Sequence, residues 1–281
     1  MELSALDLDD RYRTILDTCH AFVISYPANW PALDLTPFGV TLAKERRFTA
    51  TRLHSRDVID GLHHLDGVTF SDQDMLMPRW VLFDCGEFPG IVFGFGRLAK
   101  DLPQAARKAY QVEERDDVFV PLSMWVAIPC AEDGAWFGHN LSSANLILKG
   151  DDALPGLATL TKIVGVKLTK ATKQYGATQW SSSSIGLHLR LGAMEVLSAY
   201  TPAHTHAETL AYRVDVDDEQ SVSSLRKGWK ADAISGERTL DADDSDAIRK
   251  LHDELEAGAR WQLQRAERRD GAQRLHLCSL P

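Results

Sequence analysis

One run of the sequence, residues 155–192, constrains the fold more than any other. It begins with Pro155-Gly156, continues through an amphipathic segment to Gly176, and ends in four serines and a Leu-Gly-Ala corner. This order predicts a glycine turn, a helix, a short strand, a second helix and a further strand. A glycine turn that leads into a helix N-terminus presents unpaired main-chain N–H groups, so it can hold a phosphate. The run therefore predicts a phosphorylated cofactor.

The first helix of this run has the clearest periodicity in the chain, and we expect it over Leu157–Tyr175. Its apolar residues recur at steps of three or four: Leu157, Leu160, Val164, Leu168, Ala171 and Tyr175. Gly176 follows the last of them, as is typical of a helix end. The next elements are predicted as a strand over 177–180, a helix from Ser182 or Ser183 to Leu191, and strands over 194–201 and 209–216.

The residues before this run mix helical and strand patterns. Helical spacing covers 10–24, 49–65 and 102–110, and a loop rich in proline covers 26–37. Trp80–Asp84 and Ile91–Phe95, joined by a Gly/Pro turn, predict a β-hairpin. Phe119–Ile128 predicts a buried strand. Trp136–Leu148 is compatible with a strand, a helix that begins at Asn140, or a strand with a helical end.

Strands and helices interleave without strict alternation, which favours an α+β fold with a mixed, largely antiparallel central sheet flanked by helices. After Val216 the composition becomes acidic and polar, and Ala247–Arg269 reads as one charged helix. We therefore expect three segments. Residues 1–77 form an N-terminal helical and loop extension, 78–216 form the α+β core, and 217–281 form a charged helical C-terminal extension.

Composition excludes several function classes. The formal charge of −9 and the absence of a basic stripe argue against a nucleic-acid partner. The four cysteines are widely spaced, which favours a reduced, cytoplasmic setting. The acidic N-terminus does not resemble a signal peptide. The sequence contains no run of about 18 apolar residues, so we expect no membrane partner. The sequence leaves open whether the chain is a monomer or a homodimer.

The run Pro155-Gly156-Leu157-Ala158, the long helix, Tyr175-Gly176-Ala177 and Leu187–Ala193 resemble the second half of a GNAT-type N-acyltransferase domain. In that family a Gln/Arg-x-x-Gly-x-Gly/Ala turn holds the pyrophosphate of acyl-coenzyme A. Gly156 and Ala158 match the last two positions, while Ala153 replaces the Gln or Arg and removes one side-chain contact. The likeness covers about residues 78–216, and either Phe119–Ile128 or Trp136–Leu148 supplies the strand that leads to the turn.

The resemblance implies acyl-coenzyme A as co-substrate and an amine, or less readily a hydroxyl, of a small molecule or protein as acceptor. The residues expected to bind the cofactor are Gly150, Gly156, Leu157, Ala158, Thr159 and Thr161. Two of them, Gly150 and Gly156, permit close approach of the backbone. His188 falls where the family places the tyrosine that protonates the departing thiolate, so the resemblance implies that acid role for it.

The segment Trp136–Ser143 is dense in functional side chains. His139 can take the proton of an amine, since an imidazole titrates near neutral pH. Asn140, Ser142 and Ser143 can orient a polar acceptor. The same residues are also compatible with a plain strand end and helix cap.

Two other functions stay open on the sequence. The first is a module that binds coenzyme A or another ligand without turnover. The presence of Ala153 instead of Gln or Arg, and of His188 instead of Tyr, favours it. The second is a hydrolase or metalloenzyme that uses His139 with His204 and His206, a His-x-His pair with the spacing of metal ligands on an extended segment. No third ligand is evident from spacing, so we expect no metal.

Overall fold

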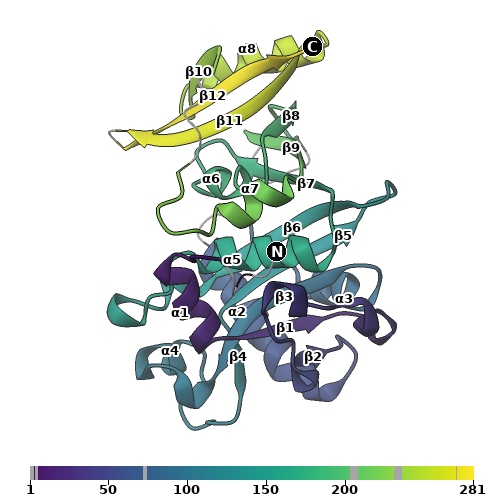
Figure 1. The fold of residues 1–281 in the computed structure, drawn as a ribbon, viewed down its shortest axis with the longest axis vertical. Coiled ribbons are helices and arrows are strands. Elements are labelled where there is room, and N and C mark those ends of the chain that lie inside the picture. Colours follow the sequence, from purple (N-terminus) through teal and green to yellow (C-terminus); the bar gives the residue numbers. More distant parts are fainter. Residues whose placement is uncertain (1–2, 4–5, 72–74, 203–207, 231–235, 270) are drawn as a thin grey trace. The chain divides into compact units, whose positions relative to one another are not determined.

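The computed structural model describes residue 3 and the ranges 6–71, 75–202, 208–230, 236–269 and 271–281 (Figure 1). The chain forms two compact units. The first contains Met1–Pro129, Gly138–Lys170 and Leu225–Lys227, and the second contains Cys130–Phe137, Ala171–Ser224 and Gly228–Pro281. The long strand β6 (Ala135–Ser143) gives its residues up to Phe137 to the second unit and the remainder to the first.

The first unit is built on strands in the order β6-β5-β3-β1-β2, most of them antiparallel. They are β1 (His20–Ile24), β2 (Arg47–Phe48), β3 (Ile91–Leu98), β5 (Ser123–Pro129) and the later part of β6. The short β4 (Phe119–Pro121) pairs with the end of β3. β1 and β2 run parallel to each other.

The described residues of this unit also form five α-helices and several short 3-10 helices. The α-helices are α1 (Asp10–Thr18), α2 (Arg56–Phe70), α3 (Arg79–Glu87), α4 (Gln104–Ala109) and α5 (Leu157–Leu168). The 3-10 helices are Pro27–Ala32, Thr36–Phe38, Lys44–Arg46, Leu53–Ser55, Ala99–Asp101, Ala144–Leu146 and Gly150–Asp152. No helix among the residues that the structure describes is long and apolar enough to cross a bilayer.

Strand register determines which helix covers which face of this sheet. Val23, Phe93 and Trp125 are register partners, so their side chains share one face. α5 packs on that face, because a side chain at Gly165 would meet the ring of Trp125. The neighbouring residues face the other way, and there Gly86 of α3 lies against Ile24. α5 and α3 therefore cover opposite faces of the sheet.

The second unit has strands in the order β10-β12-β11-β8-β9-β7-β6. They are β7 (Lys173–Gln179), β8 (Met194–Ser198), β9 (Thr209–Asp215), β10 (Arg238–Asp241), β11 (Arg260–Arg269) and β12 (Ala272–Leu280), with the start of β6. All these pairs are antiparallel except β6 with β7. Its helices are α6 (Ser184–His188), α7 (Asp218–Ser223) and α8 (Ser245–Glu256), and α8 contacts β8, β10 and β11.

The predicted fold class is confirmed: the sheet strands are largely antiparallel and helices flank them. The predicted start of the long helix at Leu157 and the strands at 91–95, 194–201 and 209–216 also match observed elements. Trp136–Leu148, which the sequence left open, is a strand followed by a 3-10 turn. This strand, β6, is the one that leads to the glycine turn.

The predicted strand at Trp80–Asp84 is wrong, because these residues lie in helix α3. Its buried residues Val81, Leu82 and Cys85 follow helical spacing, whereas Trp80 and Phe83 are exposed. A short apolar run of aromatic and branched residues does not by itself distinguish a strand from a helix. Packing of Gly86 against Ile24 then selects the helix.

Three predicted helices end earlier than the sequence indicates. The charged helix predicted over Ala247–Arg269 ends as α8 at Glu256, and Arg260–Arg269 forms strand β11 after Gly258, whose φ is +93°. α5 ends at Leu168, and β7 begins at Lys173 rather than at 177. α1 ends at Thr18, and the remainder of the predicted 10–24 helix is strand β1.

The division of the chain into three domains stays a prediction. Strands from different predicted segments nevertheless pair with each other. β1 comes from the segment 1–77 and pairs with β3, while β11 comes from 217–281 and pairs with β8.

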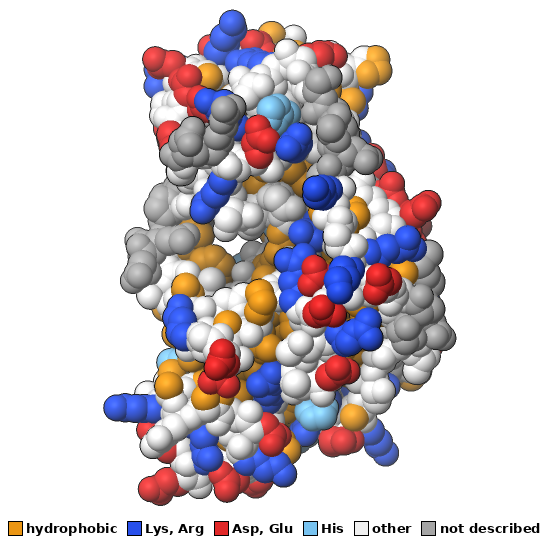
Figure 2. All heavy atoms as spheres, turned by 60° about the vertical axis from the view of Figure 1, so that its left-hand side comes forward, with side chains coloured by type: hydrophobic (Ala, Val, Ile, Leu, Met, Phe, Trp, Pro, Cys, Tyr) orange, Lys and Arg blue, Asp and Glu red, His pale blue; other side chains and the backbone are white. Residues whose placement is uncertain are grey.

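On the face drawn in Figure 2, basic and acidic side chains are intermingled.

The close packing of α5 on the sheet gives a direct test of the fold. A Cβ atom at Gly165 would lie 2.3 Å from Cε3 of Trp125, so Gly165→Ala requires the helix to move. We expect a loss of about 1–3 kcal/mol in the free energy of unfolding, measured by urea denaturation. Gly186→Ala in α6 is the control, because its Cβ meets nothing within 4 Å. Equal stability of the two variants would contradict the packing described.

Candidate active site

The first turn of α5 carries the main-chain donors that the sequence predicted. Gly156 is its N-cap, with φ of +85° in the left-handed region, and no side chain caps the helix. The N–H of Leu157 donates to the carbonyl of Leu154 at 3.1 Å. Within the described part of the chain, no hydrogen bond occupies the N–H of Ala158 or Thr159. Both residues are partly exposed, so these donors can receive an anion.

Helix α1 forms a wall beside this turn. A Cβ at Gly156 would lie 2.6 Å from Cε1 of Tyr12 and 3.3 Å from Cδ of Arg11. Glycine is required here both by the positive φ and by this contact. The guanidinium of Arg11 lies 4.8 Å from the centre of the Tyr12 ring. Sequence reasoning missed Arg11, since the 145 or so residues that separate it from the turn gave no signal.

Two further residues predicted to bind the cofactor have different surroundings. The hydroxyl of Thr161 is fully buried and shares a hydrogen bond of 2.6 Å with Ser123, whose Oγ accepts from the N–H of Phe95. Thr161 therefore joins α5 to the sheet. Gly150 has φ of +58° and begins the 3-10 helix Gly150–Asp152, where a Cβ would meet nothing within 4 Å. Its exposed position leaves the prediction for Gly150 open.

The predicted base, His139, lies on one side of strand β6. Two residues predicted to orient the acyl acceptor, Asn140 and Ser142, lie on the other side. His139 is exposed, yet partial burial of its ring lowers its pKa below that of a free imidazole. It is therefore neutral at pH 7 and able to accept a proton. Asn140 and Ser142 alternate with His139 along the strand and face helix α2.

Asn140 and Ser142 belong to an internal hydrogen-bond network with Asp66 of α2. Asn140 donates from Nδ2 to Asp66 at 2.6 Å, and Ser142 donates to Oδ1 of Asn140 at 3.4 Å. The other carboxylate oxygen of Asp66 accepts from the N–H of Met77 at 2.6 Å. Burial raises the pKa of Asp66. The network positions β6 rather than presenting Asn140 or Ser142 to a ligand, while Ser143 is partly exposed.

His188, the predicted acid, lies inside the second unit. It ends α6, is 6% exposed, and its ring centre lies 5.0 Å from that of Tyr212. These are the surroundings of a packing histidine. The role implied by the family resemblance therefore receives no support from its position.

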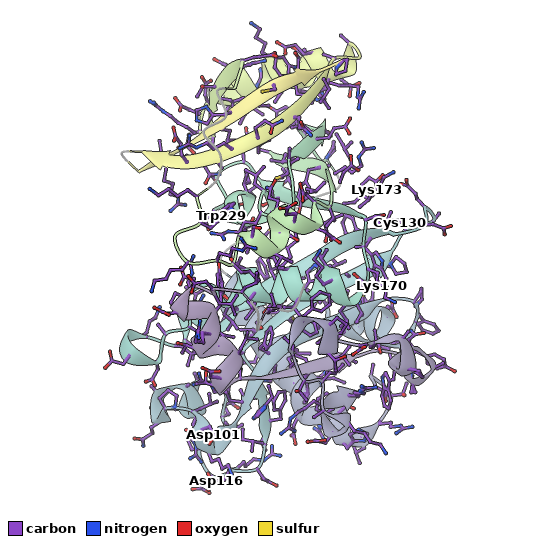
Figure 3. The ribbon with its side chains drawn as sticks, viewed as in Figure 1. Asp101, Asp116, Cys130, Lys170, Lys173 and Trp229 are labelled. Atoms are coloured by element: carbon purple, nitrogen blue, oxygen red, sulfur yellow. The ribbon has the colours of Figure 1, made fainter. Side chains whose placement is uncertain are left out.

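β6 and β7 form a short parallel pair. Their register runs from Ala135↔Lys173 to Phe137↔Tyr175 and ends there, although β6 continues to Ser143 and β7 to Gln179. Cys130 and Lys173, labelled in Figure 3, lie where the pair begins, and the N–H of Cys130 donates to Ala135. The chain passes from β6 through the glycine turn and α5 to β7, and then to α6, β8 and β9. This is the order of strand, glycine turn, helix and strand that the sequence predicted.

No protein-family model and no curated protein sequence matches the chain. Among solved structures it is similar to the ribosomal-protein-S18-alanine N-acetyltransferase from Escherichia coli, at 7% identity and a TM-score of 0.38, over 57% of this chain and 88% of that one.

Two further similar structures contain coenzyme A. An acetyltransferase of Bacillus subtilis in complex with CoA has 10% identity and a TM-score of 0.33, over 56% of this chain and 93% of that one. The NatC complex bound to Gag peptide and CoA has 12% identity and a TM-score of 0.39, over 59% of this chain and 95% of that one.

The metalloenzyme alternative depends on a histidine pair that the structure does not describe. His204 and His206 lie outside the described residues. Among the residues that are described, no group of three or more His, Cys, Asp or Glu side chains could hold a metal ion.

Lys162 is an unexpected charged group next to the candidate anion site. It lies in α5 one turn after Ala158 and is 2% exposed. Burial lowers its pKa to about 7 from 10.5. Lys162 is not among the apolar positions that define the periodicity of this helix, so its burial was not expected.

The pKa of Lys162 predicts a pH dependence of stability. Between about pH 7 and 10.5 the unfolded chain binds a proton at Lys162 that the folded chain does not, so the free energy of unfolding rises with pH in this window. Lys162→Met removes this contribution. We expect the slope to fall when urea denaturation is compared at pH 7, 8, 9 and 10. Lys167→Met, on a partly exposed side chain of the same helix, should keep the wild-type slope; identical slopes in all three proteins would refute the assignment.

Proposed function

We propose that this protein transfers an acyl group from acyl-coenzyme A to an amine of a small molecule or protein. The observation that carries the proposal is the N-terminus of α5, where a left-handed glycine precedes free first-turn N–H groups in the part of the chain that comes after strand β6. This is a site for a phosphate or diphosphate. The CoA present in two of the similar structures agrees with such a ligand.

The diphosphate would accept hydrogen bonds from the N–H groups of Ala158 and Thr159, with the Thr159 hydroxyl nearby on the same turn. Arg11, beside Gly156, would supply the positive charge that Ala153 does not. Asp9 lies 3.3 Å from Nε of Arg11 and moderates that charge. The site therefore fits an anionic ligand that is bound mainly by main-chain N–H groups and stabilised by one nearby cation.

The thioester would lie along β6. Its pairing with β7 ends at Phe137, so the main-chain N–H groups of the following residues are not used in that pairing. Such an N–H can polarise the thioester carbonyl and stabilise the charge that develops on its oxygen. Binding both substrates in place supplies much of the rate acceleration, and no covalent intermediate with the protein is required.

His139 would act as the base. Its imidazole is neutral at pH 7, so it can take the proton of the attacking amine directly or through a water molecule. Asp66 accepts a hydrogen bond from Asn140, the residue that follows His139 in β6. This contact holds the strand and thereby fixes the direction in which His139 projects. His188 has no part in this scheme, because it is buried against Tyr212.

The burial of His188 favours one alternative, a module that binds coenzyme A without turnover. If the position that supplies the acid in the family is closed to solvent here, the thiolate must be protonated by another group or by water. Binding and turnover are therefore tested separately.

Binding is tested with acetyl-coenzyme A and acetyl-pantetheine, which lacks the diphosphate. We expect acetyl-coenzyme A, and not acetyl-pantetheine, to raise the Tm in a thermal-shift measurement. Arg11→Gln should weaken the binding of acetyl-coenzyme A about fivefold to tenfold, the loss of one charge-assisted hydrogen bond. Arg13→Gln, an exposed change on the same helix, is the control. Equal effects of the two ligands on the wild-type Tm would remove the case for the anion site.

Turnover is tested by release of free coenzyme A thiol in the presence of a panel of amines. His139→Ala should lower kcat/KM about 10²-fold without changing the KM for acetyl-coenzyme A, because the base is needed for proton transfer and not for binding. The lowered pKa of His139 predicts that wild-type activity falls with decreasing pH only below about 6.5. His20→Ala, at the exposed first residue of the otherwise buried strand β1, is the control. Binding with no thiol release from any amine would support the module instead.

A further inference from the structure

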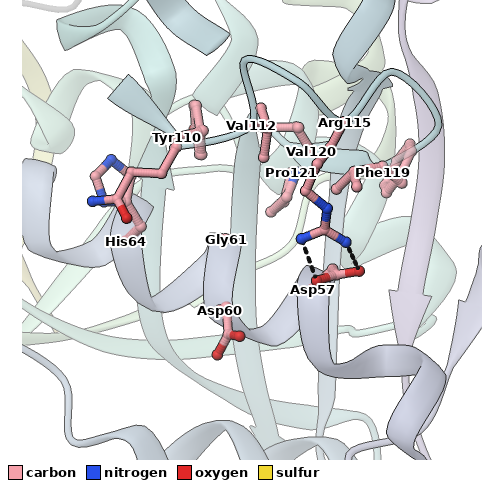
Figure 4. Close-up of a pocket in the computed structure, with 12 residues that line it drawn as sticks. Asp57, Asp60, Gly61, His64, Tyr110, Val112, Arg115, Phe119, Val120 and Pro121 are labelled. Carbon is pink, nitrogen blue, oxygen red and sulfur yellow. Dashed lines mark hydrogen bonds and ion pairs between the residues drawn. The ribbon is translucent and has the colours of Figure 1, made fainter. Parts of the chain in front are cut away.

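A pocket in the first unit lies between α2 and the segment that connects α4 to β4 (Figure 4). Its volume is about 240 Å³. One wall is a single face of α2, formed by Asp57, Asp60, Gly61 and His64, which follow the spacing of neighbouring helical turns. None of the residues assigned above to acyl transfer lines it. It is therefore a separate feature of this unit.

Gly61 lets the two walls approach each other. A Cβ at this position would lie 2.7 Å from Cδ of Pro121, which belongs to β4. The pocket thus has a closed floor where α2 meets the strand. Above it, Val112, Val118 and Phe119 supply apolar surface.

Two of the residues that line the pocket each have a buried side-chain polar atom without a hydrogen-bond partner in the described part of the chain. These atoms are Nε2 of His64 and Oη of Tyr110. Tyr110 is 8% exposed, and its ring centre lies 5.1 Å from that of His64. A buried polar atom without a partner costs about 1–3 kcal/mol, so such atoms are rare unless a ligand or water satisfies them.

This end of the pocket is uncharged. Burial lowers the pKa of His64 and raises the pKa of Tyr110, so the imidazole and the phenol are both neutral at pH 7. A neutral imidazole accepts a hydrogen bond at one nitrogen, and a phenol donates one. Together they match a single hydroxyl group, which donates to His64 and accepts from Tyr110.

The charges elsewhere in the pocket are already paired. Arg115 forms two hydrogen bonds with Asp57, of 3.0 and 2.7 Å, and in Figure 4 this pair lies away from His64. Asp60 pairs with Arg79 and with Arg56. A charged ligand would have to displace one of these pairs, so the pocket favours an uncharged one.

We propose that this pocket binds an uncharged small molecule that carries one hydroxyl group on an apolar ring or chain, such as a phenol or an apolar alcohol. The hydroxyl bonds to Nε2 of His64 and Oη of Tyr110, and the apolar part lies against Val112, Val118 and Phe119. An apolar cavity of about 150 Å³ already admits benzene, so a volume of about 240 Å³ holds one substituted ring.

The probe is p-cresol, with toluene as its match without the hydroxyl, titrated calorimetrically into the full chain. We expect p-cresol to bind the wild type at least about tenfold more tightly than toluene, as two buried hydrogen bonds allow. Tyr110→Phe keeps the ring and removes Oη, so it should reduce this ratio to within about threefold. Tyr26→Phe, at a half-exposed tyrosine outside the pocket, should retain the wild-type ratio.

A second measurement guards against loss of the fold. Because Oη of Tyr110 has no partner within the described chain, Tyr110→Phe without ligand should be as stable as the wild type or more stable. A destabilised Tyr110→Phe would show that the hydroxyl is already bonded. Equal affinity of the wild type for p-cresol and toluene, no heat with either, or an unchanged ratio in Tyr110→Phe would each overturn the proposal and leave a pocket that holds water.

Discussion

The packing of α5 on Trp125 is the contact on which the rest of the first unit depends. Gly165 has no side chain where the indole ring lies, and the hydroxyl of Thr161 bonds to Ser123 one turn earlier. These two contacts fix both the distance and the rotation of the helix against β5. They also fix where its first turn lies. The free N–H groups at that turn are therefore placed by contacts made further along the helix.

The sequence predicted the elements whose pattern is set by their own residues. Leu157 begins α5 as expected, because Gly156 and the apolar spacing after it are local signals. Trp80–Asp84 and Arg260–Arg269 were assigned wrongly for the same physical reason: long-range packing decided between two compatible patterns. In β11, Leu263 is fully buried between two glutamines, and the arginines elsewhere in the strand hide the alternation of buried and exposed positions.

The candidate site was predicted in part. Ala158, Thr159 and His139 lie on the expected elements, in a first helical turn and on the strand that precedes it. Arg11 and Asp66 could not be found, because each reaches its partner from a distant helix, beside Gly156 and Asn140 respectively. His188 and Thr161 were expected at a ligand and are buried, since an alignment position gives no information on which way a side chain faces.

The wall that α1 builds beside Gly156 has a consequence for the chain as a whole. The helix ends at Thr18, and the first sheet strand begins at His20. Proteolytic cleavage after Thr18 would leave every strand of the first unit intact and remove Tyr12 and Arg11 together. Such a truncated protein would retain its sheet while its glycine turn became open to solvent, so affinity for an anion would decline before global unfolding could be detected.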